Sequence, residues 1–439
     1  LRGDILAGGY CPSVSQIVKN IAKKYEKFNK KSLQRVVNAT GVAIHTNLGR
    51  SVISEEILSR AAEVITGYSN LEYSLENGAR SNRYDYVGSS AAELIGLEDA
   101  LIVNNNAGAV FLTLNTFAKG REVVVSRGEL VEIGGSFRVP EVMADSGALL
   151  KEIGTTNKTN LSDYENSIGE NTAMLAKIHR SNFDIVGFTQ DVKMSEIAAL
   201  ARKKNLIDYY DLGSGFYGRL PYGLERGEDS LQGLSESDVS LVSLSGDKLL
   251  GSAQCGIILG KKELIARLRK NQLLRMLRVD KVIISILIQS LKAYANGEFE
   301  LITTLKLINR SEAELLGLAK HINENLKNPL EIARTTTFVG GGTMPNKRIP
   351  SVALAFSGDA EATGEVVDIL HGKDSTFNAN SYVKMMPHTV AANIAIYYGL
   401  KGRLIPTGSA CTSASQAIGY SYEAIKFGLI DMMLAGGAD

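Results

Sequence analysis

Short apolar runs recur along the middle of the chain, separated by longer stretches of mixed or polar character. Each run has the length of a buried strand, and the stretches between them have helical or loop patterns. This alternation predicts a mostly parallel sheet covered by helices on both faces, which is an α/β fold. The runs are residues 100–103, 122–125, 148–153, 173–178, 206–210, 239–244 and 256–259.

Other segments flank this predicted sheet. Residues 12–35 have apolar side chains at helical spacing, which predicts an amphipathic helix. A β-like run over 36–44 leads into a polar turn that bears Arg50, and a helix is predicted from there to about Ile65. The later predictions are helices within 261–290 and over about 310–326, a Gly-rich turn at 340–342 and a strand-like run at 351–356.

These patterns suggest two or three domains in 439 residues. We expect a short helical region at 1–35, a large domain at 36–290 and a smaller α+β domain at 291–370 that closes over it. The character changes near Ser375, so 375–439 is expected to be a separate segment. The chain starts at Leu1 and stops just after a Gly-Gly pair, so both ends are expected to be truncated.

Composition adds little to this prediction. The formal net charge is +1 and 44% of residues are hydrophobic, so the totals argue neither for nor against a nucleic-acid partner. Three distant cysteines provide no disulfide framework and no metal site, which suits a cytoplasmic protein. We find no apolar run long enough for a membrane span and no signal peptide. The basic face of the helix at 12–35 fits either solvent or a phosphate backbone.

Candidate chemistry lies at the ends of the predicted strands. Asn104–Ala109 follows the first run and opens a helix, where backbone N–H groups could cradle a phosphate. Asp211 follows the run at 206–210 and could hold a proton on a pyridine nitrogen, although a turn aspartate is the alternative. Lys248 follows the run at 239–244. There, desolvation would free its amine to act as a nucleophile, and a surface turn is the alternative.

The order of these three features is that of the aspartate-aminotransferase-like fold, whose cofactor is pyridoxal phosphate. Ser245, three residues before Lys248, is placed to donate its hydroxyl to the same phosphate. Arg275 and Arg278 are three residues apart and are predicted to share a helix face. They could bind an oxyanion or belong to a solvated basic helix.

Residues 3–370 resemble the bacterial selenocysteine synthase family, whose activity is L-seryl-tRNA(Sec) selenium transfer. Position 180 departs from the pattern, because an arginine stands where a small polar residue is expected. The resembling motifs, in chain order, are HTNLGR at 45–50, NNNAGAV at 104–110, VVVSRGELVEIGG at 123–135, EIGTTN at 152–157, H-x-S-N at 179–182, DLGSG at 211–215, SLSGDKLLG at 243–251 and LRVDK at 277–281.

This resemblance implies roles for individual residues. Lys248 would form the Schiff base with pyridoxal phosphate and act as the proton shuttle, and Asp211 would pair with the pyridine nitrogen. The implied phosphate contacts are Asn105, Asn106 and Ser245. The implied ligands of selenophosphate, the selenium donor, are Arg50, Arg275 and Arg278. The implied reaction converts L-seryl-tRNA(Sec) to L-selenocysteinyl-tRNA(Sec) through a dehydroalanyl intermediate, in a ring of dimers whose tRNA-binding region is here shortened to 1–35.

The segment 375–439 resembles β-ketoacyl-[acyl carrier protein] synthases around their nucleophilic cysteine, here Cys411. A helix N-terminus would lower the pKa of that thiol. That family also needs two downstream histidines, which this chain lacks, and His388 lies upstream. We therefore interpret the segment as a truncated thiolase-like fragment with Cys411 as a vestigial nucleophile. Alternatives for the whole chain are a pyridoxal-phosphate lyase acting on a small amino acid or amino sugar phosphate, a condensing enzyme and a non-functional chimera.

Overall fold

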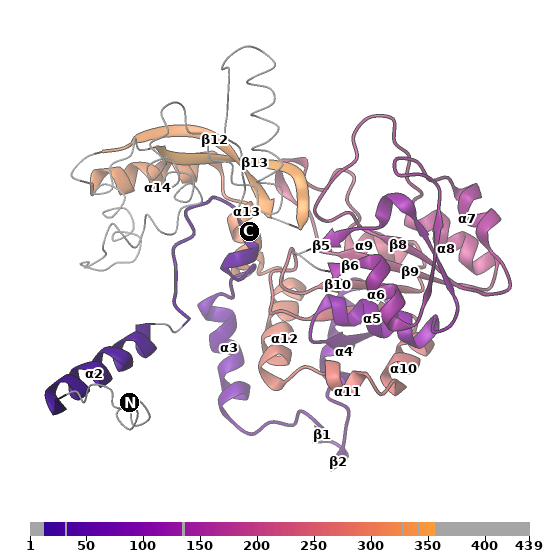
Figure 1. The fold of residues 1–439 in the computed structure, drawn as a ribbon, viewed down its shortest axis with the longest axis horizontal. Helices are drawn as coiled ribbons and strands as arrows, with labels where there is room; N and C mark the ends of the chain where they lie inside the picture. The colour runs from indigo at the N-terminus through magenta and orange to yellow at the C-terminus, as the bar shows by residue number, and fades with distance from the viewer. Residues whose placement is uncertain (1–12, 31–32, 134–136, 327–328, 341, 356–439) are drawn as a thin grey trace, which may run out of the picture. The chain divides into compact units, whose positions relative to one another are not determined.

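The computed structural model describes residues 13–30, 33–133, 137–326, 329–340 and 342–355 (Figure 1). The chain divides into two compact units, Leu1–Ala39 and Thr40–Asp439. The segment 375–439, with Cys411 and His388, lies outside the described residues. Among the described residues, no helix combines the length and apolar character that a bilayer crossing requires.

The first unit contains helix α2 (Val14–Lys30), within the predicted 12–35. Ser13 starts it, since its side-chain oxygen accepts a hydrogen bond from the backbone N of Gln16. The apolar positions fall on one face of the helix, as expected from their spacing. Ile17 is half-buried, and the other large apolar side chains described are exposed to solvent, namely Val14, Val18, Ile21, Tyr25 and Phe28.

The second unit is built on a seven-stranded sheet with the order β3-β11-β10-β9-β8-β4-β7. All seven strands predicted from the apolar runs are present in it. Only β11 runs antiparallel to its neighbours, while the other pairs are parallel. The strands are β3 (Asp99–Val103), β4 (Glu122–Ser126), β7 (Leu149–Ile153), β8 (Thr172–Ile178), β9 (Ile207–Gly213), β10 (Leu241–Ser245) and β11 (Gly256–Gly260).

Helices cover this sheet because its central strands are apolar on both faces. Every residue of β10 and β11 is buried, which is the burial expected for strands with helices on each side. The helices that contact the strands are α4 (Asp85–Ile95) and α10 (Lys262–Lys270) on β3, α5 (Asn106–Phe117) on β10 and β11, and α8 (Met194–Lys203) on β8 and β9. Short helices α6 (Val139–Ser146), α7 (Leu161–Ser167) and α9 (Leu231–Glu236) complete the connections.

The segment 261–290 contains three helices rather than one continuous helix. After α10 the chain becomes extended at Asn271, and it does so again at Arg278 after the short α11 (Leu274–Leu277). Helix α12 (Lys281–Ala295) then starts at Asp280, whose side chain accepts hydrogen bonds from two backbone N–H groups. Arg278 therefore lies between the end of α11 and the start of α12, in a break that the sequence pattern did not reveal.

The C-terminal part of the described chain combines helices with a hairpin. Helices α13 (Thr303–Ile308) and α14 (Glu312–Glu324) precede strands β12 (Glu331–Gly340) and β13 (Thr343–Ala355). The strands pair antiparallel, and α14 packs on β13 (Figure 1). The run predicted at 351–356 is the end of β13. Strand β12 was missed because most of its side chains are exposed or half-buried, so it has no apolar run.

The β-like run at 36–44 is not a strand of the sheet. Only Ile44 forms a bridge, to Gly340, and its backbone N donates to the carbonyl of Val339. The prediction of a strand there was wrong, because the run's bonding partner is the tip of the distant hairpin. The short 3₁₀ helix η1 (Thr46–Leu48) follows, and helix α3 (Glu55–Thr66) is the helix expected to end near Ile65.

Candidate active site

The predicted chemical residues gather at the carboxyl edge of the sheet. Asn104 follows β3, His179 follows β8, Asp211 lies near the end of β9, and Lys248 follows β10. These strands are parallel or, for β3, point the same way through the antiparallel β11. The edge they share is where α/β sheets bind ligands.

Lys248 lies in a tight loop that the backbone holds closed. Gly246 and Cys255 are joined by a 2.9 Å hydrogen bond, and Gly251 N donates to the carbonyl of Lys248 at 2.9 Å. Only 7% of Lys248 is exposed. Burial lowers the pKa of its amine and the nearby Arg50 lowers it further, against the attraction of Asp211 and Asp247. The sequence-based expectation of a desolvated lysine is therefore confirmed.

Asp211 is also buried, and its carboxylate is held from one side. Its Oδ1 accepts hydrogen bonds from Asn106 Nδ2 at 2.8 Å and from Gly213 N at 3.1 Å. Burial raises the pKa of Asp211, against these hydrogen bonds and the attraction of Lys248. The same burial thus favours the neutral form of both Asp211 and Lys248.

The first turn of α5 lies where the phosphate cradle is predicted, and its asparagine side chains bond within the protein. Asn105 caps the helix by accepting a 2.7 Å hydrogen bond from Gly108 N, and Asn106 donates to Asp211. Both amides are therefore engaged inside the protein. What α5 offers an anion is the backbone N–H groups of Asn106 and Ala107, since those of Gly108 and Ala109 donate to Asn105.

Three observations fit a bound pyridoxal phosphate here. The Oδ1 atoms of Asn104 and Asn106 are buried without a hydrogen-bond partner in the described structure. Such orphaned acceptors are rare unless a ligand or water satisfies them. A side chain at Gly256 would collide with the carbonyl of Asn105 at 2.3 Å, so only glycine lets β11 approach the cradle. Ser245, the last residue of β10, is also buried and precedes Lys248 by three residues.

Arg50 is joined to the loop that carries Lys248. It adopts a left-handed backbone conformation, with φ of 61°, and its NH1 lies 3.0 Å from Asp247 Oδ2. The next residue, Ser51, donates its hydroxyl to the carbonyl of Ser252 at 2.6 Å. Asp247 Oδ1 is buried with no partner in the described chain. The HTNLGR turn therefore reaches the site although it lies almost 200 residues away in sequence.

Arg275 and Arg278 do not share a helix face, so that prediction was wrong. Arg275 belongs to α11, whereas Arg278 follows it with an extended backbone. Both are exposed, and neither guanidinium group forms a hydrogen bond or ion pair with another residue that the structure describes. Their segment still reaches the site, because Leu277 accepts a 2.8 Å hydrogen bond from Asn104 N. The two guanidinium groups are therefore available to an anion arriving from solvent.

His179 and the acids around it received no role from the sequence. His179 Nε2 lies 2.9 Å from Glu228 Oε2, and its backbone N donates to the carbonyl of Asp211. One residue earlier, Ile178 N donates to Glu129, whose other oxygen accepts from Lys177 Nζ at 3.1 Å. Burial raises the pKa of Glu129. The H-x-S-N motif was a signal for His179, but nothing in the pattern indicated that Glu228 would contact its ring or that Glu129 would bond to the two residues before it.

Arg180, the departure from the family pattern, is mostly buried and pairs with Asp191. The guanidinium thus has a carboxylate partner within the chain.

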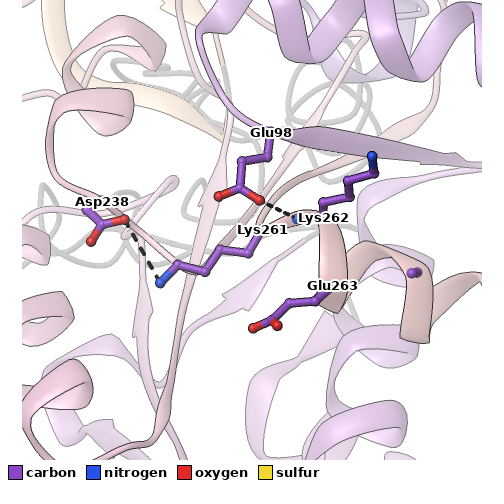
Figure 2. A pocket seen from close by; sticks show the side chains of 6 residues that line it. Glu98, Asp238, Lys261, Lys262 and Glu263 are labelled. Carbon is purple, nitrogen blue, oxygen red and sulfur yellow. Dashed lines mark hydrogen bonds and ion pairs between the residues drawn. The ribbon is translucent and has the colours of Figure 1, made fainter.

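A different kind of hollow lies at the amino edge of the sheet (Figure 2). Its volume is about 570 Å³, and its charged lining residues are three acids and two lysines, namely Glu98, Asp238, Glu263, Lys261 and Lys262. Lys261 Nζ lies 3.9 Å from Asp238 Oδ1, and the backbone N of Lys262 donates to Glu98. None of the predicted site residues lines it. Among the described residues, no cluster of His, Cys, Asp and Glu could hold a metal ion.

Two family models match the chain. The model described as L-seryl-tRNA selenium transferase matches residues 36–376, and the model described as Beta-ketoacyl synthase, N-terminal domain, matches residues 333–439. The two matches overlap over the hairpin of β12 and β13. The first covers most of the chain.

Curated relatives named L-seryl-tRNA(Sec) selenium transferase cover similar lengths. The protein of Campylobacter concisus is 70% identical over 360 residues, which are 82% of this chain and 81% of the relative. That of Campylobacter fetus subsp. fetus is 57% identical, covering 79% of each. That of Sulfurimonas denitrificans is 52% identical, covering 82% of this chain and 81% of the relative.

Solved structures match the fold at low identity. D-glucosaminate-6-phosphate ammonia-lyase matches with a TM-score of 0.53 and 18% identity, over 74% of this chain and 79% of that one. An aspartate aminotransferase of Thermus thermophilus matches with a TM-score of 0.44 and 16% identity, over 72% and 79%. The expected aspartate-aminotransferase-like α/β fold is confirmed for the described residues by the sheet order and the first of these matches.

Proposed function

Since the chain belongs to the L-seryl-tRNA selenium transferase family, we propose that it converts L-seryl-tRNA(Sec) to L-selenocysteinyl-tRNA(Sec) with selenophosphate as the selenium donor. The observation that carries the proposal is the burial of Lys248 at the carboxyl edge of the sheet, the edge at which β9 presents the buried Asp211 and α5 begins after β3. A lysine with a lowered pKa in that position is typical of enzymes that use pyridoxal phosphate.

Four groups would hold pyridoxal phosphate. Lys248 would attach it, the first turn of α5 and Ser245 would bind its phosphate, and Asp211 would contact its ring nitrogen. We revise the part of Asn106, whose amide orients the carboxylate of Asp211. When bound, the cofactor supplies an electron sink for negative charge that develops at the α-carbon of the seryl group.

Lys248 is also the group that moves the proton. Exchange of the β-hydroxyl of serine for selenium requires a proton to leave the α-carbon and later return. The amine of Lys248 can carry it in both directions because its pKa lies below the ordinary lysine value. Asp211 holds the proton at the ring nitrogen, and Asn106 keeps that carboxylate in place.

The three arginines would bind selenophosphate. A guanidinium holds a multiply charged oxyanion without changing its own charge. Arg50 is anchored to Asp247, next to Lys248, and the exposed Arg275 and Arg278 sit on the segment that bonds to Asn104. We expect Arg275→Ala and Arg278→Ala each to raise the KM for selenophosphate at least about tenfold, with little change in the KM for seryl-tRNA.

The exposed lysines of α2, among them Lys19, Lys23 and Lys24, would contact the phosphates of tRNA(Sec). We further propose a cytoplasmic homo-oligomer, a ring of dimers, as the family resemblance implies. The segment 375–439 is proposed to be a β-ketoacyl-synthase-like fragment without condensing activity. Condensation of acyl and malonyl carrier-protein substrates that a Cys411→Ala change abolished would contradict this.

The test of the main proposal is conversion of seryl-tRNA(Sec) by the full chain loaded with pyridoxal phosphate, in the presence of selenophosphate labelled with radioactive selenium. We expect label in the aminoacyl ester, and none with Lys248→Ala. Seryl-tRNA(Ser) and free L-serine are the matched substrates. Turnover of free serine without labelled tRNA would favour the lyase alternative. No product from folded, cofactor-loaded protein would sink the proposal.

A further inference from the structure

The peptide bond that follows Lys248 is held by one residue of its own loop and by one from another part of the chain. Its carbonyl, on Lys248, accepts from Gly251 N at 2.9 Å. Its N–H, on Leu249, donates to the Ser214 side-chain oxygen, a long hydrogen bond of 3.4 Å. Ser214 in turn lies 3.0 Å from Thr343 Oγ1, which donates to the carbonyl of Gly342 at 2.8 Å.

The donor and acceptor of each hydrogen bond in this series can be assigned. Thr343 uses its hydroxyl proton on the carbonyl of Gly342, so it accepts from Ser214. Ser214 therefore donates to Thr343 and keeps a lone pair for the N–H of Leu249. A continuous series of hydrogen bonds thus runs from the backbone beside Lys248 to the start of β13. All three residues are buried, with exposed fractions of 2%, 4% and 0% for Leu249, Ser214 and Thr343.

The local backbone is shaped to present Ser214 in this way. Gly213 and Gly215 flank it with φ of 66° and 51°, in the left-handed region that other residues rarely adopt. A Cβ on Gly213 would meet Ser181 Oγ at 2.7 Å, and one on Gly215 would meet Leu244 at 2.9 Å. The DLGSG motif therefore places two groups: Asp211 in the site, and Ser214 beneath the lysine loop.

We propose that Thr343 is a positioning residue for Lys248, which acts through Ser214 and makes the attachment lysine depend on the tip of the β12–β13 hairpin. The proposal rests on the proposed function of Lys248. Residue 343 lies within both family matches, and the proposal assigns it a role in the selenium transferase part, because its hydrogen bonds lead to the loop of Lys248. Hydroxyl groups at positions 214 and 343 should then affect the geometry and proton affinity of Lys248 without contacting substrate.

The first test is hydrogen–deuterium exchange of peptides that cover residues 246–252, in the full chain without cofactor. Thr343→Val and Ser214→Ala should each speed exchange at Leu249 about threefold to tenfold, the effect of losing one modest hydrogen bond. Thr343→Ser, which keeps the hydroxyl, should restore the parent rate. The matched control is Thr304→Val, because Thr304 is equally buried but its hydroxyl has no partner in the described chain.

The second test is the pH titration of the visible absorbance band of the cofactor-loaded protein. Its midpoint should shift in Thr343→Val and in Ser214→Ala and stay at the parent value in Thr343→Ser. Unchanged exchange and an unchanged midpoint in Thr343→Val would overturn the proposal, and so would equal changes in Thr304→Val. A parent protein that develops no visible band would instead contradict the proposed function, while the exchange test still decides the role of Thr343.

Discussion

Charged side chains are buried at the carboxyl edge of the seven-stranded sheet and partly exposed at its amino edge. At the carboxyl edge Lys248 and Asp211 are almost fully buried, and burial shifts both pKa values toward the neutral forms. At the amino edge Lys261 and Asp238 keep 32% and 57% of their side chains exposed and face each other across 3.9 Å. Exposed pairs of that kind contribute little to stability or reactivity. The hollow at the amino edge therefore lacks the buried, pKa-shifted groups found at the carboxyl edge.

A second contrast lies on β9 itself. Asp208 and Asp211 are three residues apart, both are buried, and burial raises both pKa values. Asp208, at the amino end, has each carboxylate oxygen bonded to Ser240, at 2.8 and 2.5 Å. Asp211 points to a lysine and to an asparagine whose own oxygen lacks a partner. Burial alone therefore does not distinguish the two acids, whereas the unpartnered Asn106 oxygen beside Asp211 does.

The largest effect is expected from Lys248→Ala. It removes both the attachment point and the proton carrier, so turnover should fall at least about a thousandfold. The visible absorbance of protein incubated with pyridoxal phosphate should disappear as well. Lys261→Ala is the control at the other edge, and it should retain both. A Lys248→Ala protein that kept the absorbance band and the activity would contradict the placement of the chemistry at the carboxyl edge.

Asp211→Asn should reduce kcat by about a hundredfold, the loss typical when one charge-stabilising group is removed. Asn106→Ala should have a smaller effect of about tenfold, because it only releases the carboxylate. The matched control is Asp208→Asn, which should lower the melting temperature and leave kcat unchanged. Equal losses of kcat in the two aspartate variants would show that burial, not position, governs the effect.

Lys248→Met is expected to stabilise the cofactor-free protein by about 1 kcal/mol at neutral pH. Because burial lowers the pKa of Lys248, the unfolded chain binds more protons than the native one between the folded and the ordinary pKa. The parent's stability therefore rises with pH across that window, and the advantage of methionine shrinks there. Denaturant unfolding between about pH 6 and pH 10 measures it.

Asp211 contributes with the opposite sign. Its pKa is raised, so the native chain binds more protons than the unfolded one just above the ordinary aspartate value, and stability falls with rising pH there.

Lys261→Met is the control for Lys248→Met, and its effect on the free energy of unfolding should stay within about 0.5 kcal/mol at every pH. A stabilisation by Lys248→Met that did not change toward alkaline pH would contradict the assigned pKa direction.

The smallest effect is expected from Asp238→Asn in the hollow. It breaks the exposed pairs with Arg202 and Lys261 but keeps a side chain that tolerates the left-handed backbone at this position. The free energy of unfolding should change by less than about 1 kcal/mol and kcat should not change. A clear loss of activity would mean that the amino edge takes part in the reaction.

Much of this molecule followed from local sequence. Seven short runs identified the seven strands of the sheet, most clearly for the central β10 and β11, because a strand buried on both faces is mostly apolar. Lys248 and Asp211 were found in the same way, as polar residues directly after such runs. Strand β12 and the break at Arg278 were not found, since one lacks apolar residues and the other depends on a cap at Asp280.

Tertiary structure alone decided how these residues are used. Hydrogen bonds join Asn106 to Asp211, Arg50 to Asp247 and Thr343 to Ser214 across 105, 197 and 129 positions of the chain. Local pattern reports which face of an element is buried, because burial follows the period of the helix or strand. It does not report which distant loop will contact a given residue. That depends on the packing of the whole sheet, which turned a lysine in a loop into the centre of a site.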